Sequence, residues 1–425
     1  MINRDSFVSL RSRNFRLLWF GLMLSFTGSM MQNAALLWHV SLLVPNNKGL
    51  ALGMVGLVKV VPVVVFSMIS GVVADAWDRR RLLLVTQVAA TAVAVALAVL
   101  TFRGLRVVWP VYLLAALGAA VNAFDLPARA ALIPNLVPRE HLPNAISLNS
   151  IMFQAASVAG PSIGGLMIAT SGVAWVYFAN AVSFGAVLAA LMMMRGVPSR
   201  SSSIVAPDGE PATGSEKAHD DVSLGAALEG LRFVFRSPLI RSTMLLDFFA
   251  TFFSSANALL PIFAQDVLKV GARGYGWLYA APAAGAVISS AAMVPMTERI
   301  ERRGATLLWS VGAYGVATVV FGLSRSFWLT FACLAMTGAA DTVSTVIRNI
   351  VRQLETPDRL RGRMTGVNMV FFMGGPQLGE FEAGAVANWY GAPFSVITGG
   401  LGCVLATAWI AWSTPVLRKY RSETA

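Results

Sequence analysis

The chain has 425 residues, of which 56% are hydrophobic and 13% are charged, and its mean hydropathy is +0.65. This composition is too apolar for a soluble protein of such length and indicates a membrane protein with many spans. The formal net charge of +12 does not indicate nucleic-acid binding, because most of it lies in short segments between apolar runs.

The apolar runs lack the ten-residue alternation of an outer-membrane barrel, so the spans are predicted to be helices. About twelve are expected from their lengths. They fall into an N-terminal six-helix bundle in residues 1–195 and a C-terminal one in residues 239–425, joined by a cytoplasmic linker, 196–238. The predicted spans are 15–43, 50–74, 81–102, 108–128, 145–170, 174–195, 239–264, 275–297, 304–323, 327–350, 362–388 and 392–412.

Basic residues are concentrated in the segments that alternate with the outer loops. This bias predicts a multi-pass protein of the cytoplasmic membrane with both termini in the cytoplasm. The N-terminus has no small-residue cleavage site, so we expect a retained anchor rather than a signal peptide. The Lys and Arg residues outside the cytoplasmic segments are Lys48, Lys59, Arg103, Arg106, Lys269, Arg273 and Arg325.

The loop after the second span reads G-V-V-A-D-A-W-D-R-R-R and holds Gly71, Asp75, Arg79 and Arg80. A purely topogenic basic loop would need neither a small residue nor a carboxylate at the membrane edge. The stretch resembles the gating loop between helices two and three of the major facilitator superfamily. It departs from that pattern at Ala76, which replaces an Arg, and at Asp78, which replaces a Gly. The resemblance implies an all-α major facilitator fold, a transporter with two pseudo-symmetric bundles.

The fifth span contains G-P-S-I-G-G, with Gly160, Pro161, Gly164 and Gly165. Its glycines permit close helix contact, and the proline bends the helix. In the superfamily this pattern marks antiporters. The longer stretch 123–166 is similar to the subfamily of the enterobactin exporter and macrolide efflux permeases, which implies export of an organic molecule. The same letters match a hydrolase elbow, but the strand-turn-helix context is absent, so we expect no enzyme activity.

An internal repeat supports two bundles. A shift of 219 residues places identical residues in register, which predicts duplicated halves. The superposed pairs are Arg129 and Arg348, Pro138 and Pro357, Asn149 and Asn368, Phe153 and Phe372, Gly160 and Gly379, Gly165 and Gly384, and Gly172 and Gly391.

Within the linker, 199–221 is rich in polar residues and is expected to be disordered, whereas 222–236 is predicted to form an amphipathic helix on the membrane surface.

Ionisable residues inside spans are costly and are therefore candidates for a gate or for proton coupling. Asp125 and Arg129 stand four residues apart, which also suits a purely structural pair. Asp341 and Arg348 form a looser copy at seven-residue spacing. Asp247 has no partner nearby in its own span, which makes it a candidate proton site.

Lys59 lies at a depth in the second span similar to that of Glu380 in the eleventh. In the superfamily these two helices face each other across the halves. We therefore expect Lys59 to pair with Glu380 or with Glu382 and to close the outer side. The alternative is that Lys59 snorkels outward and the glutamates line a wet vestibule.

Polar and aromatic residues near the middle of the spans are candidates for the substrate cavity, although helix packing explains each of them equally well. The expected function is proton-coupled export of a small amphipathic organic compound, such as a siderophore or drug; importer, uniporter and membrane sensor remain alternatives. The protein is expected to act as a monomer, without cofactor or metal, and the chain lacks an ATP-binding loop. The cavity candidates are Gln32, Asn33, Asn149, Phe153, Gln154, Asn257, Asn368, Phe372 and Gln377.

Overall fold

The computed structural model describes residues 4–195, 231–357 and 360–421, without the side chains of 4–6, 67–69, 71, 72, 74–76, 298, 361–363, 365, 366 and 369–373. All regular structure in this part of the chain is helical. Ten of its helices are long and apolar enough to cross a membrane. The expected all-helical membrane protein is thereby confirmed, while the number of twelve spans stays a prediction.

The N-terminal group of long helices follows the predicted spans closely. Helix α1 packs against α5 and α6, α2 against α4, and α3 against α4 and α6. The largest difference is at the end of α4, which continues to Leu132 rather than stopping at 128. The group consists of α1 (Arg13–Leu43), α2 (Lys48–Ala76), α3 (Arg79–Phe102), α4 (Trp109–Leu132), α5 (Leu142–Ser171) and α6 (Val173–Met193).

The C-terminal group repeats this arrangement. Helix α10 packs against α12, α11 against α12 and α14, and α13 against α8 and α14. Short α9 (Leu260–Ile262) and α15 (Pro415–Lys419) complete the described helices. The long helices are α8 (Pro238–Phe253), α10 (Gly271–Met296), α11 (Arg303–Leu323), α12 (Phe327–Glu355), α13 (Arg361–Tyr390) and α14 (Ala392–Ser413).

The predicted seventh span, 239–264, falls within a stretch long and apolar enough to cross a membrane, Pro238–Val267, but the structure divides this stretch into several helical pieces. Helix α8 ends at Phe253, and the chain continues through Ser254 and Ser255 into a 3-10 turn, α9 and a π-helical turn at Phe263–Val267. Pro261 lacks the N–H that a regular helix would use at this point. The Ser255 hydroxyl also lies within hydrogen-bonding distance of the carbonyls of Thr251 (2.5 Å) and Pro376 (2.9 Å), which offers the backbone a local alternative to helix.

The backbone itself shows the duplication. Gly172 joins α5 to α6 with a φ of +93°, and Gly391, its partner in the 219-residue repeat, joins α13 to α14 with a φ of +89°. Both helix junctions therefore use a left-handed residue, a conformation that glycine adopts without strain.

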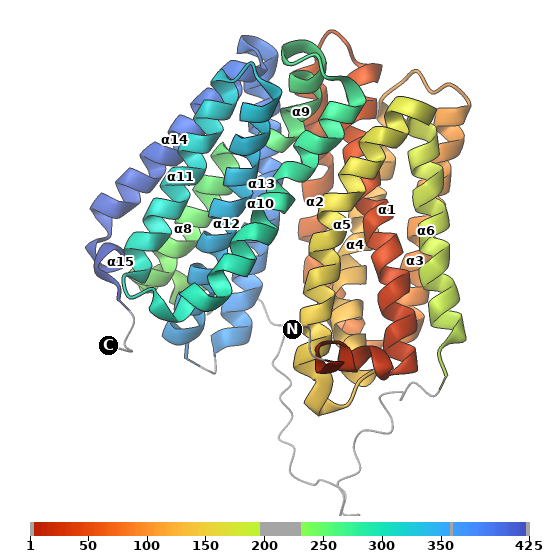
Figure 1. Cartoon of the computed structure of the whole chain (residues 1–425), viewed down its shortest axis with the longest axis horizontal. Coiled ribbons are helices and arrows are strands. Elements are labelled where there is room, and N and C mark those ends of the chain that lie inside the picture. Colours follow the sequence, from red (N-terminus) through yellow and green to blue (C-terminus); the bar gives the residue numbers. More distant parts are fainter. Residues whose placement is uncertain (1–3, 196–230, 358–359, 422–425) are drawn as a thin grey trace, which may run out of the picture.

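The two groups lie side by side in Figure 1, with α1 to α6 in red to yellow-green and α8 to α15 in green to blue. We call the lower end in that view, where α6 ends and α8 begins, the linker end, and the opposite end the far end. A shared apolar core, with Leu52 of α2 and Tyr275 of α10, joins the groups toward the far end. Toward the linker end each group has its own core, one around Leu83 and one around Ile347.

Only the last part of the predicted amphipathic helix is described. Residues 231–236 are helical, and Val234, which is 2% exposed, packs in a small core with Ile240 and Met244 of α8 and Met364 of α13. This end of the linker is therefore attached to the C-terminal group. The expectation for 199–221 lies outside the described residues.

Candidate functional site

Glycines let the two groups approach closely at the far end. In α2, Gly49, Gly53 and Gly56 lie along α13: a Cβ atom on Gly49 would stand 2.7 Å from the amide nitrogen of Asn388, and one on Gly53 would stand 3.1 Å from the Cα of Gly384. Such contact between backbones requires small residues. We call this contact the α2–α13 seam.

The G-P-S-I-G-G motif forms a second seam. A Cβ atom on Gly165 would stand 2.6 Å from the Cα of Gly276 in α10, so α5 and α10 also meet backbone to backbone across the groups. Gly160 and Gly164 serve a different contact, since both face Met31 of α1. The motif therefore packs α5 against one helix in each group.

Polar contacts at the far end reinforce the seams, and the sequence analysis missed them. Lys48 Nζ lies 2.8 Å from Asp266 Oδ2 and donates to Gln265 Oε1 at 3.1 Å. Gln265 Nε2 donates to Ser41 Oγ at 2.7 Å. We call these four residues the far-end latch. The predicted spans leave Lys48 in an outer loop, whereas the structure places it at the start of α2. Its partners Gln265 and Asp266 lie on the π-helical turn, which the sequence did not predict.

The latch is expected to be weak, because the Asp266 side chain is 50% exposed. Replacing Lys48 by Ala should shift the far end toward opening by about 0.2 to 1 kcal/mol, a factor of about five at most. Far-end opening can be followed by labelling a cysteine placed in the latch region. The exchange Lys48→Asp with Asp266→Lys should restore closure, and high salt should remove the difference. A change above about tenfold, or one insensitive to salt, would show that Lys48 acts in another way.

Lys59 and Glu380 are brought together at the α2–α13 seam. They interact electrostatically, although their charged atoms form no ion pair within 4.0 Å among the described residues. The Glu380 side chain packs at the seam, since a Cβ atom on Gly56 would stand 2.9 Å from the Cβ and 3.0 Å from the carboxylate Oε2 of Glu380. Glu382 is half-buried, and no electrostatic contact joins it to Lys59.

In the N-terminal group, Asp125 and Arg129 of α4 form a buried pair, with 2.5 Å between Arg129 Nε and Asp125 Oδ2. Asp125 Oδ1 accepts hydrogen bonds from Thr86 Oγ1 (2.9 Å) and Gln87 Nε2 (2.7 Å) of α3. The Arg129 guanidinium lies 4.4 Å from the centre of the Phe26 ring of α1, a cation–π contact. The cluster ties α3, α4 and α1 together.

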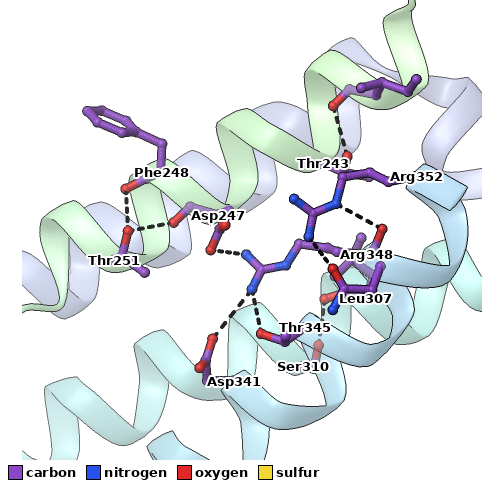
Figure 2. Close-up of polar contacts among 12 residues, drawn as sticks. Thr243, Asp247, Phe248, Thr251, Leu307, Ser310, Asp341, Thr345, Arg348 and Arg352 are labelled. Carbon is purple, nitrogen blue, oxygen red and sulfur yellow. Dashed lines mark hydrogen bonds and ion pairs between the residues drawn. The ribbon is translucent and has the colours of Figure 1, made fainter. Parts of the chain in front are cut away.

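In the C-terminal group, Arg348 of α12 contacts two carboxylates (Figure 2). Its Nη1 is ion-paired with Asp247 of α8, and its Nη2 lies 3.5 Å from Asp341 Oδ1. The side chains of Asp247 and Arg348 are 5% and 2% exposed, whereas that of Asp341 is 52% exposed. Asp247, which the sequence singled out because its own span offers no charged partner, is paired with an arginine of α12. We call these three residues the C-terminal triad.

A second arginine stands behind the triad. Arg352 Nε donates to the Arg348 carbonyl at 3.2 Å, and its Nη2 donates to Asn349 Oδ1 at 2.7 Å (Figure 2). Arg348 Nη2 also donates to Thr345 Oγ1 at 2.8 Å. The 219-residue repeat pairs Arg348 with Arg129, so equivalent arginines hold a carboxylate in both groups. Arg129 binds Asp125 on its own helix, whereas Arg348 binds Asp247 on a neighbouring helix.

The arginines of the loop after α2 act within the N-terminal group. Arg79 Nη1 donates to the Ala131 carbonyl at 2.8 Å, and Arg80 Nε donates to the Leu191 carbonyl at 3.0 Å. Both therefore satisfy carbonyls at helix C-terminal ends. Asp78, the departure from the superfamily pattern, caps α3 by accepting from the Arg81 amide at 2.8 Å. The packing around Gly71 and the side chain of Asp75 lie outside what the structure describes.

The cavity candidates separate into several environments. Gln32 accepts a hydrogen bond from Asn180 at 2.8 Å, and Phe153 packs edge-on to Phe26. Two of the candidates, Asn368 and Gln377, have a buried amide oxygen without a hydrogen-bond partner in the described structure. Asn33, Asn149 and Gln154 are half-buried. The side chain of Phe372 lies outside the described residues.

Three predicted residues meet at one cavity in the C-terminal group. Asn257, Asp341 and Glu380 line a space of ≈ 210 Å³ between α8, α10, α11, α12 and α13. We call it the C-terminal cavity. It adjoins the triad through Asp341 and the α2–α13 seam through Glu380.

Comparisons with known proteins agree with this architecture. Residues 4–424 match the model of the family described as transmembrane secretion effector. The chain is 27% identical over 354 residues to an enterobactin exporter of Escherichia coli O1:K1 / APEC, covering 83% of this chain and 81% of that protein. A similar protein of Shigella boydii serotype 18 (strain CDC 3083-94 / BS512) has the same identity and coverage.

Solved structures show the same fold. A bacterial homologue of the human lysosomal transporter Spinster, in an inward-facing and unoccupied conformation, superposes with a TM-score of 0.72 at 16% identity over 97% of this chain and 99% of that one. A bacterial homologue of the iron transporter ferroportin, in its inward-facing state, gives 0.64 at 15% identity over 93% and 99%. The matched proteins are membrane transporters, which confirms the expectation that the chain is not an enzyme. The chain belongs to the transmembrane secretion effector family of the major facilitator superfamily.

Proposed function

We propose that the protein is a proton-coupled exporter of a small amphipathic organic compound, working by alternating access of residues 1–195 and 239–425. Its relatives include enterobactin exporters, which supports export and an organic substrate of the siderophore or drug class. The bias of basic residues supports a cytoplasmic position for the linker end and both termini. Contacts between the two groups at the far end, the two glycine seams and the latch, support a state that is closed at that end.

The observation that carries proton coupling is the C-terminal triad. One arginine serves two carboxylates, of which Asp247 is buried and Asp341 is half exposed. When Asp341 takes up a proton, Arg348 keeps only Asp247 as a charged partner, so the position of its side chain depends on protonation. This links the charge of Asp341 to the packing of α8 against α12.

The coupling can be tested in liposomes with an imposed pH gradient and an internal pH dye, challenged with a panel of aryl siderophores and macrolides. A transported compound should move protons in the opposite direction. Asp247→Asn and Asp341→Asn should each remove proton movement, while Glu140→Gln, at an exposed carboxylate of the α4–α5 connection, should not. Substrate flux without proton movement in the unaltered protein would identify a uniporter. Binding without flux would identify a sensor.

Lys59 and Glu380 are proposed to stabilise the closed far end. Lys59→Glu should place two carboxylates at the α2–α13 seam and abolish transport, because the two like charges repel each other and favour an open seam. The second change Glu380→Lys should restore part of the transport rate, measured as initial efflux. A double variant as inactive as Lys59→Glu would contradict a role for the pair in the seal.

A further inference from the structure

The C-terminal cavity is lined by oxygen atoms of several kinds. Two acidic residues line it, Asp341 of α12 and Glu380 of α13, and no Lys, Arg or His is among the described residues of its lining. The remaining polar lining consists of hydroxyls and one amide, contributed by Thr251, Ser254, Ser255, Asn257, Tyr314, Thr318 and Thr337. Such a lining favours a ligand that is positively charged.

A break in a membrane helix borders the same cavity. Helix α8 ends at Phe253, and Ser254 and Ser255 leave the helical path before the 3-10 turn begins at Ala256. The carbonyl end of a helix carries partial negative charge, and interrupted helices of transporters place such ends at ion sites. Ser254 lines the cavity and is 5% exposed, and its Oγ faces the thiol of Cys403 but has no oxygen or nitrogen hydrogen-bond partner in the described structure. Because a thiol is a weak hydrogen-bond partner, this hydroxyl remains available to a ligand in the cavity.

The charge balance favours a monovalent ligand. Asp341 shares Arg348 with Asp247, and Glu380 interacts with Lys59, so part of each carboxylate's charge is already offset. A divalent cation would need more uncompensated carboxylate oxygens than these. The part of the lining that the structure describes also contains no Cys or His, which are the ligands that zinc and copper prefer.

The cavity is a feature of one group rather than of the common fold. In the 219-residue repeat, Asp341 corresponds to Asn122, and Glu380 corresponds to Pro161. Neither carboxylate has an acidic counterpart in the N-terminal group. The helix break also has none, because α1 runs without interruption from Arg13 to Leu43. Helix packing in the superfamily therefore does not by itself require the two carboxylates or the break in α8.

We propose that the C-terminal cavity binds one small monovalent cation, an alkali-metal ion or a primary ammonium group, through Asp341, Glu380 and the hydroxyls at the break in α8. The volume of ≈ 210 Å³ leaves room for such a cation with some of its water. Binding would place a positive charge between the triad and the α2–α13 seam. It does not depend on which compound the protein exports.

The test uses the purified full-length protein in nanodiscs and the chlorides of lithium, sodium, potassium and n-propylammonium. Choline chloride, which has no N–H donor and is larger, controls for ionic strength. At least one small cation should raise the melting temperature in a saturable way, while choline should not. The cation that binds most tightly distinguishes an alkali-ion site from an ammonium site.

Variants locate the bound cation. Asp341→Asn and Glu380→Gln should each weaken its affinity by about tenfold or more, whereas Glu140→Gln should leave it unchanged. Because both carboxylates also contact basic residues, Thr337→Val offers a change that leaves those contacts intact, and it should weaken binding severalfold. Equal effects of choline and the small cations would overturn the proposal. So would unaltered affinity in both Asp341→Asn and Thr337→Val. Neither result bears on proton-coupled export, which the liposome assay measures separately.

Discussion

Replacing Arg348 by Met is expected to lower the free energy of unfolding by about 3 to 5 kcal/mol. The change leaves Asp247 buried between α8 and α12 without its ion pair, and it removes the only basic partner that Asp341 has in the described structure. Unfolding of the reconstituted protein by denaturant measures the loss. Proton-coupled transport should be lost as well, because the triad no longer contains the group that its two carboxylates share.

A double variant separates the charge from the packing. Adding Asp247→Leu to Arg348→Met removes the uncompensated carboxylate, and apolar replacements of a buried pair are often neutral or stabilising. The double variant should therefore regain most of the stability but not the proton coupling. If the double variant is no more stable than Arg348→Met, the stability lost in Arg348→Met does not come from the broken ion pair between α8 and α12.

Replacing Gly53 by Val is expected to reduce transport by about ten- to a hundredfold. A Cβ atom at this position would stand 3.1 Å from the Cα of Gly384, and α13 cannot yield there without opening the α2–α13 seam. Overpacking a close contact costs about 1 to 3 kcal/mol. A cost of this size lowers the equilibrium population of the state closed at the far end by roughly ten- to a hundredfold. Initial rates in liposomes measure the effect.

A matched control lies in the other group. At Gly312 of α11 a Cβ atom would meet nothing within 4 Å, so Gly312→Val changes helix propensity alone and should transport at nearly the normal rate. Cysteine labelling at the far end should be faster in Gly53→Val than in Gly312→Val. Equal transport and equal labelling in both variants would mean that the seam is not a closing surface.

Most helix bounds followed from the sequence because apolar length and glycine or proline punctuation are local properties. Gly172 and Gly391 end α5 and α13 through their own backbone conformation, which does not depend on how the helices pack. The internal repeat of the sequence pairs these two residues. The break within the seventh span was not predicted, because the composition of this span is as apolar as that of a continuous helix. Its interruption depends on Ser255, whose hydroxyl reaches a carbonyl of α13 that is distant in the sequence.

The charged residues were identified individually but their partners were only partly predicted. Asp125 and Arg129 pair along one helix, which spacing alone indicates. Asp247 and Arg348 come from helices far apart in the chain, so their pairing depends on how α8 and α12 are rotated. The approach of Lys59 to Glu380 followed from matched depth and from the resemblance to a known fold. Lys48 was overlooked because its partners occupy an irregular turn.

Alternating access is tested most directly by distances across both ends of the molecule. Spin labels at Arg103→Cys and Arg325→Cys report the far end, and labels at Glu140→Cys and Glu301→Cys report the linker end; all four native side chains are exposed. When substrate or a change of pH is applied to the reconstituted protein, the far-end distance should grow while the linker-end distance shrinks. Transport that proceeds while both distances stay fixed, or while both change in the same direction, would contradict the account.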